Sequence, residues 1–320
     1  MASYYANTAK GEAGAALDAR YAEIKAAQAK QQAHYANWLA SGTVNCGALE
    51  ETAASLGLSL DVATGRISYA PTFQKPDLGA ELWYCRHGKT GGNTEPRVYQ
   101  GYVDEPHNAL NAIGKQQAED AADKLEKLGV KPDLVVLSPL SRAAEGSTRE
   151  RNSQLQSLIS RSFSARAADT GKAFLRRNGS DRVAVETWPS SAEMQFGDWD
   201  NMMVKDMPTE SICHLFYLAQ NAVVKSAGRY VDPASGGAVP GENFVECLAR
   251  MAGVLKSVQG ALAALPSKHG PRPVALLYGH SMAGAALSIL TGNGKTVDGE
   301  SFLGFDGKYI MPNATPVQLL

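Results

Sequence analysis

The stretch Leu82–Gly88, LWYCRHG, decides the fold of this chain. Its first four residues are apolar and predict a buried strand, and Arg86 and His87 follow at the point where that strand ends. A guanidinium binds phosphate oxygens through a bidentate fork, and an adjacent imidazole is a nucleophile suited to accept a phosphoryl group. The same triplet also occurs by chance in exposed loops, so its meaning depends on the residues that follow.

Further motifs follow in an order that suits one phosphate-binding site. Two more apolar segments, 134–137 and 274–278, predict strands that also end at polar motifs. The motifs are Asn93, six residues after His87, then QGY at 100–102, SPLSRA at 138–143, EMQFGDW at 193–199, PGE at 240–242 and GHS at 279–281.

In this order the motifs resemble the histidine phosphatase (phosphoglycerate-mutase-like) superfamily, from about Ala80 to Leu320. The resemblance implies an α/β fold and a phosphohistidine intermediate. Arginines and histidines supply the positive charge that a metal ion would otherwise provide, and no cluster of acidic ligands accompanies them. We therefore expect neither a metal nor a cofactor.

His87 is the predicted nucleophile, and four other residues are predicted to surround the phosphoryl group. Arg86 and Arg142 would bind its oxygens and favour a neutral, nucleophilic imidazole at His87. Asn93 would donate a further hydrogen bond, and His280 would act as a second imidazole donor.

Glu193 is the predicted proton donor to the leaving oxygen, because Met194, Phe196 and Trp199 offer an apolar wall that would raise the pKa of a carboxyl group. Glu242 is the rival, but it also suits the start of a helix, where the macrodipole favours an acidic residue. The remaining candidates for phosphate binding are Gln100, Gly101 and Ser281. We expect Ser281 to cap the last helix rather than face the phosphate.

Phosphatases and mutases of this family differ at the second histidine. Mutases carry His-Gly-Asn-Ser there, whereas this chain has His280-Ser281-Met282 and so resembles the phosphatase branch, including the fructose-2,6-bisphosphatase relatives. We predict a phosphomonoesterase acting on a small phosphorylated metabolite, a sugar phosphate above all. A phosphoglycerate-mutase-type phosphotransferase and a non-catalytic binding module are the alternatives. Lys89, Arg97 and Lys115 are candidates for a second anionic group, although we expect them to be solvated surface charges.

Strands and helices alternate from Glu81 onward, which predicts a three-layer α/β/α fold with a mainly parallel central sheet. In such folds the site lies at the carboxyl ends of the strands, where all three strand-end motifs would meet. The predicted strands are 81–86, 133–137 and 274–278, the helices begin near 111, 141, 242 and 281, and the segment 309–320 closes the sheet.

Residues 1–79 are predicted to form a mostly helical extension of the phosphatase domain, 80–320. Apolar residues at steps of three and four predict one helix over 1–40, only shallowly buried near Gln28 and Gln31. A shorter helix follows at 48–56, and a hairpin around Thr64-Gly65. We expect this extension to pack on the domain, with a homo-oligomer contact through the N-terminal helix as the alternative.

One departure from the family pattern predicts an insertion. The helix after Arg142 is interrupted at Gly146, and its expected continuation resumes at Thr170. The 24 residues between them, 146–169, are rich in Ser and Arg and predict a solvated loop, with a basic flap as the alternative.

Composition excludes several classes of protein. The 320 residues are 44% hydrophobic and carry a net charge of −1, which gives no electrostatic reason to bind nucleic acid or an anionic membrane. The four cysteines are scattered, which argues against a zinc site and favours a reducing compartment. Without an apolar stretch long enough to span a membrane or to form a signal peptide, the expected location is cytoplasmic.

Overall fold

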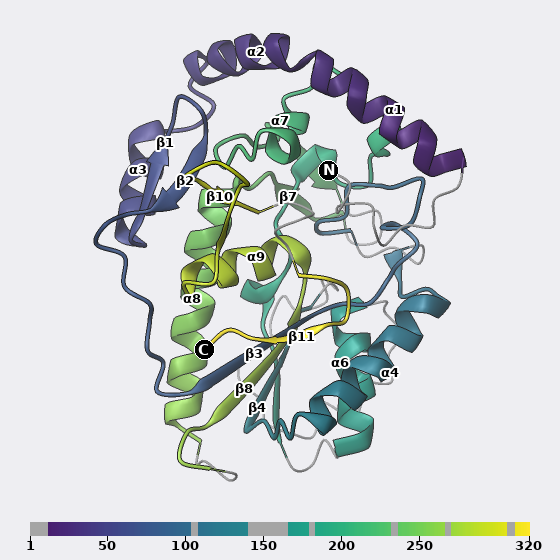
Figure 1. Cartoon of the computed structure of the whole chain (residues 1–320), viewed down its shortest axis with the longest axis vertical. Coiled ribbons are helices and arrows are strands. Elements are labelled where there is room, and N and C mark those ends of the chain that lie inside the picture. Colours follow the sequence, from purple (N-terminus) through teal and green to yellow (C-terminus); the bar gives the residue numbers. More distant parts are fainter. Residues whose placement is uncertain are drawn as a thin grey trace.

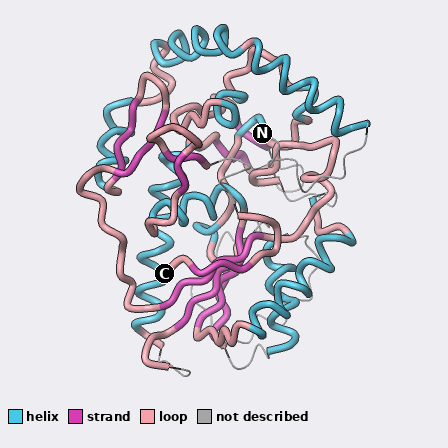
Figure 2. Tube along the Cα trace, viewed as in Figure 1, coloured by secondary structure: helices cyan, strands magenta, loops and turns pink. Residues whose placement is uncertain are grey.

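In the computed structural model, the chain forms a five-stranded sheet between helices (Figures 1 and 2). The structure describes residues 12–103, 108–139, 166–178, 183–231, 236–265, 270–305 and 311–320. The strand order is β11 (Pro316–Gln318), β3 (Glu81–Arg86), β8 (Val274–Gly279), β4 (Leu134–Leu137) and β5 (Ala184–Thr187). Only β11 is antiparallel to its neighbour, so the prediction of a mainly parallel sheet is confirmed.

Helices cover both faces of this sheet, as Figure 2 shows in cyan. On one face lie α4 (Ala112–Lys127) and α6 (Arg166–Asn178), and on the other α8 (Phe244–Ala263) and α9 (Ser281–Leu290). Successive residues of β4 alternate between these layers, because side chains of a strand point to opposite faces. Leu134 and Val136 pack in the cluster that contains α8 and α9, and Val135 and Leu137 in the cluster that contains α4 and α6.

Capping residues set the starts of two of these helices. The Oδ1 of Asn111 accepts a hydrogen bond from the amide of Gly114 at the start of α4. Asn243 and Glu246 form a reciprocal capping box at the start of α8. The sequence did not predict the edge strand β5 or several short elements: β6 (Arg229–Val231), β7 (Ala238–Pro240), β9 (Lys295–Thr296), β10 (Leu303–Gly304), α7 (Cys213–Leu218) and the 3₁₀ turns Pro189–Ser191, Gly197–Trp199 and Val204–Asp206.

The N-terminal extension differs from its prediction in two respects. The single helix predicted over 1–40 is two helices, α1 (Glu12–Ala26) and α2 (Gln28–Ala40), within the described residues. Gln31 is fully buried rather than shallow, because its Nε2 donates a hydrogen bond to the carbonyl of Thr209 at 2.5 Å. The second predicted helix is α3 (Cys46–Ser55), and the hairpin is confirmed as β1 (Leu58–Asp61) and β2 (Arg66–Tyr69).

Both N-terminal helices lie beside α7, at the end of the molecule away from the central sheet (Figure 1). Tyr21 and Ile24 of α1 are buried in a cluster with Tyr99, Met207 and Cys213. This packing on the remainder of the chain is what the apolar stripe predicted. The division of the chain at residue 79 stays a prediction.

The predicted insertion 146–169 lies outside the described residues up to position 165. Helix α6 begins at Arg166, four residues before the position where the helix was predicted to resume. Within the described ranges, none of the helices has the length and apolar character needed to cross a lipid bilayer.

Candidate active site

His87 follows β3 directly and is held in one tautomer. Its amide donates a hydrogen bond to the carbonyl of Gly279 at 3.0 Å, which extends the parallel ladder between β3 and β8. Its Nδ1 lies 2.7 Å from the carbonyl oxygen of Gly88. A carbonyl only accepts, so Nδ1 carries a proton, and in the neutral imidazole the lone pair is therefore on Nε2. The buried imidazole therefore presents a nucleophilic nitrogen.

Gly88 lets the backbone come close to α4 and α6. A Cβ at this position would collide with the carbonyl oxygen of Gly114 in the first turn of α4. The amide of Gly88 donates to the Oγ1 of Thr170 at 3.1 Å. Thr170 is the residue at which the interrupted helix was predicted to resume, and the structure places it next to the catalytic motif.

His280, after β8, lies beside His87 with its ring centroid 5.4 Å away. Its Nε2 forms a hydrogen bond of 2.7 Å with the Oγ of Ser138, which follows β4. The hydroxyl of Tyr84 fixes its backbone, since it donates to the carbonyl of His280 at 2.7 Å and accepts from the amide at 2.6 Å. Three strand ends thus converge on two imidazoles, as the strand-end motifs predicted.

Arg86 is buried at the end of β3, where its Nη1 donates to the carbonyl of Met311 at 3.1 Å. Arg142, the second predicted arginine, lies outside the described residues. The Oδ1 of Asn93 accepts from the amide of Thr90 at 2.9 Å. Its Nδ2 is buried and has no hydrogen-bond partner in the described part of the chain, which leaves a donor suited to an anionic oxygen.

These side chains surround a cavity at the carboxyl ends of β3 and β8. Five predicted residues line it together with five others: Arg86, His87, Asn93, Gln100 and Ser281, and Arg97, Val98, Phe196, Tyr217 and Met282. Gly101 does not line this cavity, and its amide donates to the Oδ1 of Asp200 at 2.6 Å.

Glu193 is 1% exposed and accepts hydrogen bonds at the start of α9. Its carboxylate accepts from the amides of Met282 and Ala283, each at 3.0 Å, and from the hydroxyl of Ser281 at 2.9 Å. The prediction that Ser281 caps α9 is wrong, since the N-cap is His280 and the carboxylate of Glu193 satisfies the amides of the first turn. The hydroxyl of Ser281 instead lies between Glu193 and the cavity.

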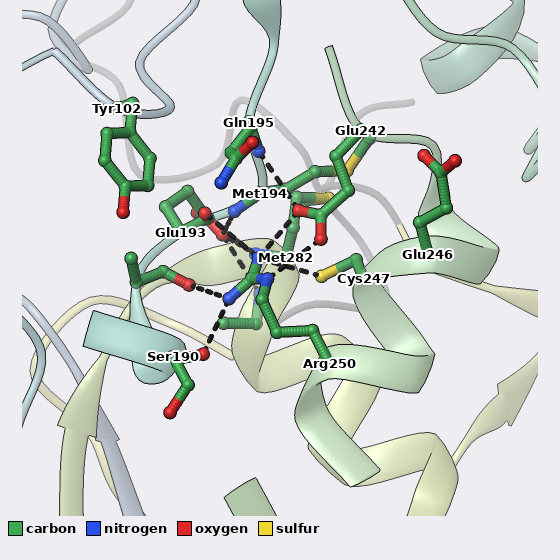
Figure 3. A network of polar contacts seen from close by, with 12 residues as sticks. Tyr102, Ser190, Glu193, Met194, Gln195, Glu242, Glu246, Cys247, Arg250 and Met282 are labelled. Carbon is green, nitrogen blue, oxygen red and sulfur yellow. Dashed lines mark hydrogen bonds and ion pairs between the residues drawn. The ribbon is translucent and has the colours of Figure 1, made fainter. Parts of the chain in front are cut away.

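Glu242 is not placed to act as an acid on the cavity. It forms a bidentate ion pair with Arg250, from the Nε to Oε1 at 2.8 Å and from Nη2 to Oε2 at 2.7 Å (Figure 3). It also accepts from the amide of Gln195 at 3.2 Å. The ranking of Glu242 behind Glu193 agrees with this geometry.

The three additional cations have different environments. Lys89 is buried, so its prediction as a solvated surface charge is wrong. Burial, together with the guanidinium of Arg97, lowers the pKa of Lys89 below its usual range. Arg97 lines the cavity and lies 3.9 Å from the carboxylate of Glu95, whereas Lys115 is exposed as predicted.

Sequence reasoning missed Tyr84, Ser138 and Arg250. Tyr84 was counted only as an apolar strand residue, and Ser138 only as part of a motif. Arg250 had no signal, because the carbonyl groups that it binds are 57 to 60 positions away. Within the described ranges, the histidines, cysteines and carboxylates form no group of three that could hold a metal ion.

The chain matches one family model and one curated relative, and it shares its fold with solved structures. The family model described as the histidine phosphatase superfamily (branch 1) matches residues 82–156. A mannitol-1-phosphatase from Eimeria tenella is 39% identical over 322 residues, which cover 95% of this chain and 96% of the relative.

Two solved structures share the fold. A mycobacterial glucosyl-3-phosphoglycerate phosphatase is 22% identical with a TM-score of 0.50, over 75% of this chain and 89% of its own. A protein described as mycobacterial hydrolase 1 is 21% identical with the same TM-score of 0.50, over 75% and 90%.

Proposed function

Because this chain belongs to branch 1 of the histidine phosphatase superfamily and is a phosphoric monoester hydrolase, we propose that it hydrolyses a sugar-alcohol phosphate of the mannitol 1-phosphate type. The observation that carries the chemistry is the pair of buried imidazoles at neighbouring strand ends, with an unprotonated Nε2 on His87. Identity to the mannitol-1-phosphatase along almost the whole of both chains supports the substrate class.

The first step is attack on phosphorus by the Nε2 lone pair of His87, with breakage of the bond between phosphorus and the sugar-alcohol oxygen. The leaving oxygen would take the proton of the Ser281 hydroxyl, which donates to the Glu193 carboxylate in this structure and would accept from Glu193 when that group carries a proton. In the second step water attacks the phosphohistidine, its proton returns to Glu193, and phosphate leaves. One water is consumed and His87 is restored.

Cationic and neutral donors would stabilise the phosphoryl group during both steps. Arg86 and the Nδ2 of Asn93 lie at the cavity, and His280 lies beside His87. Arg142 is proposed as a further donor on the resemblance alone. Charge spread over the equatorial oxygens of the transferring group is what such donors stabilise.

The remaining lining suits a polyol chain. Arg97 and Tyr217 carry donors for hydroxyl groups, and Val98, Phe196 and Met282 offer apolar surface to the carbon backbone. No large apolar pocket is required for such a flexible, polar substrate.

A panel of phosphoesters tests this proposal. Phosphate release by the purified protein is measured with mannitol 1-phosphate, sorbitol 6-phosphate, fructose 6-phosphate, mannose 6-phosphate and 3-phosphoglycerate. We expect the highest kcat/KM for a hexitol phosphate. A higher value for 3-phosphoglycerate or for a cyclic sugar phosphate would refute the substrate class.

A further inference from the structure

We propose that Arg250 is a positioning residue for Glu193 and that Glu242 supports the same segment, by holding Arg250 and by binding the backbone of Gln195. This inference rests on the proposed function, in which Glu193 is the proton donor. We define the Arg250 network as Arg250, the carboxylate of Glu242 and the three carbonyl groups that the guanidinium binds.

The three carbonyls belong to the segment that carries Glu193. The Nη1 of Arg250 donates to the carbonyls of Ser190 and Ala192, both at 2.8 Å, and the Nη2 donates to the carbonyl of Glu193 at 3.1 Å. A guanidinium is planar, so it fixes these acceptors in one plane as well as at a distance. Figure 3 shows Arg250 reaching from α8 to this segment.

Glu242 fixes Arg250 and also the other side of Glu193. Its two carboxylate oxygens accept hydrogen bonds from the Nε–H and from one Nη2–H of the guanidinium of Arg250. The carboxylate of Glu242 accepts a hydrogen bond from the amide of Gln195 at 3.2 Å, and the amide of Glu242 donates to the carbonyl of Gln195 at 2.7 Å. The backbone is therefore held on both sides of residue 193.

Such support matters because residues 192–196 form neither a helix nor a strand ladder, apart from a single bridge from Phe196 to Gly241. The carbonyl of Glu193 binds Arg250, whereas its carboxylate binds the first turn of α9 and Ser281. Tilting this peptide would move the carboxylate relative to Ser281 and the cavity. A displacement of about 1 Å in a catalytic group costs roughly 100-fold in rate.

A purely structural role for Arg250 makes a different prediction from a positioning role. General structural damage lowers turnover of every substrate alike. A displaced proton donor lowers kcat/KM only where the leaving group needs a proton, because kcat/KM covers the steps up to the phosphohistidine and p-nitrophenolate departs as a stable anion. The leaving-group dependence therefore separates the two roles.

The experiment compares the parent with Arg250→Lys, Glu193→Gln and the double variant, on mannitol 1-phosphate and on p-nitrophenyl phosphate. Lysine keeps the charge but cannot bind three carbonyls and a carboxylate in one plane. For Arg250→Lys we expect kcat/KM on the alkyl ester to fall by about 10- to 100-fold, with less than about 3-fold loss on the aryl ester. The double variant should be no slower than Glu193→Gln alone, because both changes remove the same proton transfer.

Arg272→Lys is the matched control. Arg272 also binds a backbone carbonyl, that of Ala80, and a carboxylate, that of Asp77, but it is half exposed and far from Glu193 in the fold. We expect parent activity on both esters. Should Arg250→Lys fail to fold, Glu242→Gln is measured in the same way, since it removes the charge of the carboxylate and keeps its shape.

The outcomes separate the two proposals. Uniform losses for Arg250→Lys beside leaving-group-dependent losses for Glu193→Gln would overturn the positioning role and leave the proton donor in place. Uniform losses for Glu193→Gln would overturn both. Additive losses in the double variant would also overturn the positioning role, because they would show that Arg250 acts independently of Glu193.

Discussion

Replacing Tyr84 with phenylalanine should destabilise the protein by an amount that follows from two hydrogen bonds. The hydroxyl that would be removed accepts from the amide of His280 at 2.6 Å and donates to its carbonyl at 2.7 Å, in a fully buried position. Loss of a partner for the buried amide costs about 1–3 kcal/mol. The carbonyl of His280 still accepts a hydrogen bond from the amide of Gly284 at 3.1 Å, so loss of its hydrogen bond from Tyr84 costs only about 0.5–1.5 kcal/mol.

The sum is roughly 1.5–4.5 kcal/mol in the free energy of unfolding, or about 2–7 °C in Tm for a chain of this size. Turnover should fall as well, because the backbone of a catalytic imidazole is less constrained. Unfolding in urea, followed by circular dichroism, gives the first quantity and phosphate release the second.

Tyr278→Phe is the control for Tyr84→Phe. Tyr278 is equally buried, but its hydroxyl has no hydrogen-bond partner in the described part of the chain. We expect a change of less than about 0.5 kcal/mol, because no bond is lost. Equal effects of the two substitutions would refute the assignment of the Tyr84 hydroxyl as a support for His280.

Four further predictions address the chemistry and the stability. His87→Ala should abolish both turnover and an acid-labile, base-stable phosphoprotein, detected with labelled substrate; near-parent turnover would exclude His87 as nucleophile. Ser281→Ala should lower kcat on an alkyl phosphate by about 10-fold or more and on p-nitrophenyl phosphate much less, because the route from Glu193 to the leaving oxygen is broken; similar losses on both esters would exclude a proton relay. Activity should survive exhaustive chelation by EDTA, and recovery of a lost activity by a divalent ion would contradict the metal-independent mechanism. Burial lowers the pKa of His214 to about 4, below its unfolded value of 6.5, so the unfolded state gains a proton first as the pH falls. The free energy of unfolding should therefore fall by about 3 kcal/mol as the pH decreases from 6.5 to 4. Urea titrations should show a flatter dependence of this free energy on pH for His214→Phe, and the dependence of the parent for a change at exposed His34.

The sequence predicted every strand of the central sheet except β5, and the residues at the strand ends, because both depend on local patterns. An apolar strand followed by a polar motif identifies a strand end, and parallel strands bring such ends together. Arg86, His87 and His280 were found in this way. The packing of Gln31 on Thr209 could not be predicted, since it depends on a segment far away in the sequence.

Roles that depend on contacts with the backbone could not be recognised in the sequence either. Ser281 resembles a helix cap in the sequence, but a carboxylate 88 positions earlier caps α9 in its place. Arg250 binds carbonyl groups, which every residue carries, so no side-chain pattern identifies its partners. The Ser281 and Arg250 assignments therefore required the three-dimensional structure.

The order of strands in the sheet has a consequence for synthesis of the protein in the cell. Within the described chain, β3 pairs with β8 and β11, and 188 positions (274 − 86) separate the end of β3 from the start of β8. At about 5–20 residues per second, a ribosome needs roughly 10–40 s to translate that distance. During this interval the nascent strand Leu82–Cys85 lacks the neighbours with which it pairs in the folded sheet, and an unpaired apolar strand favours aggregation. The nucleophile is translated early, but its site can form only after β8 has left the ribosome.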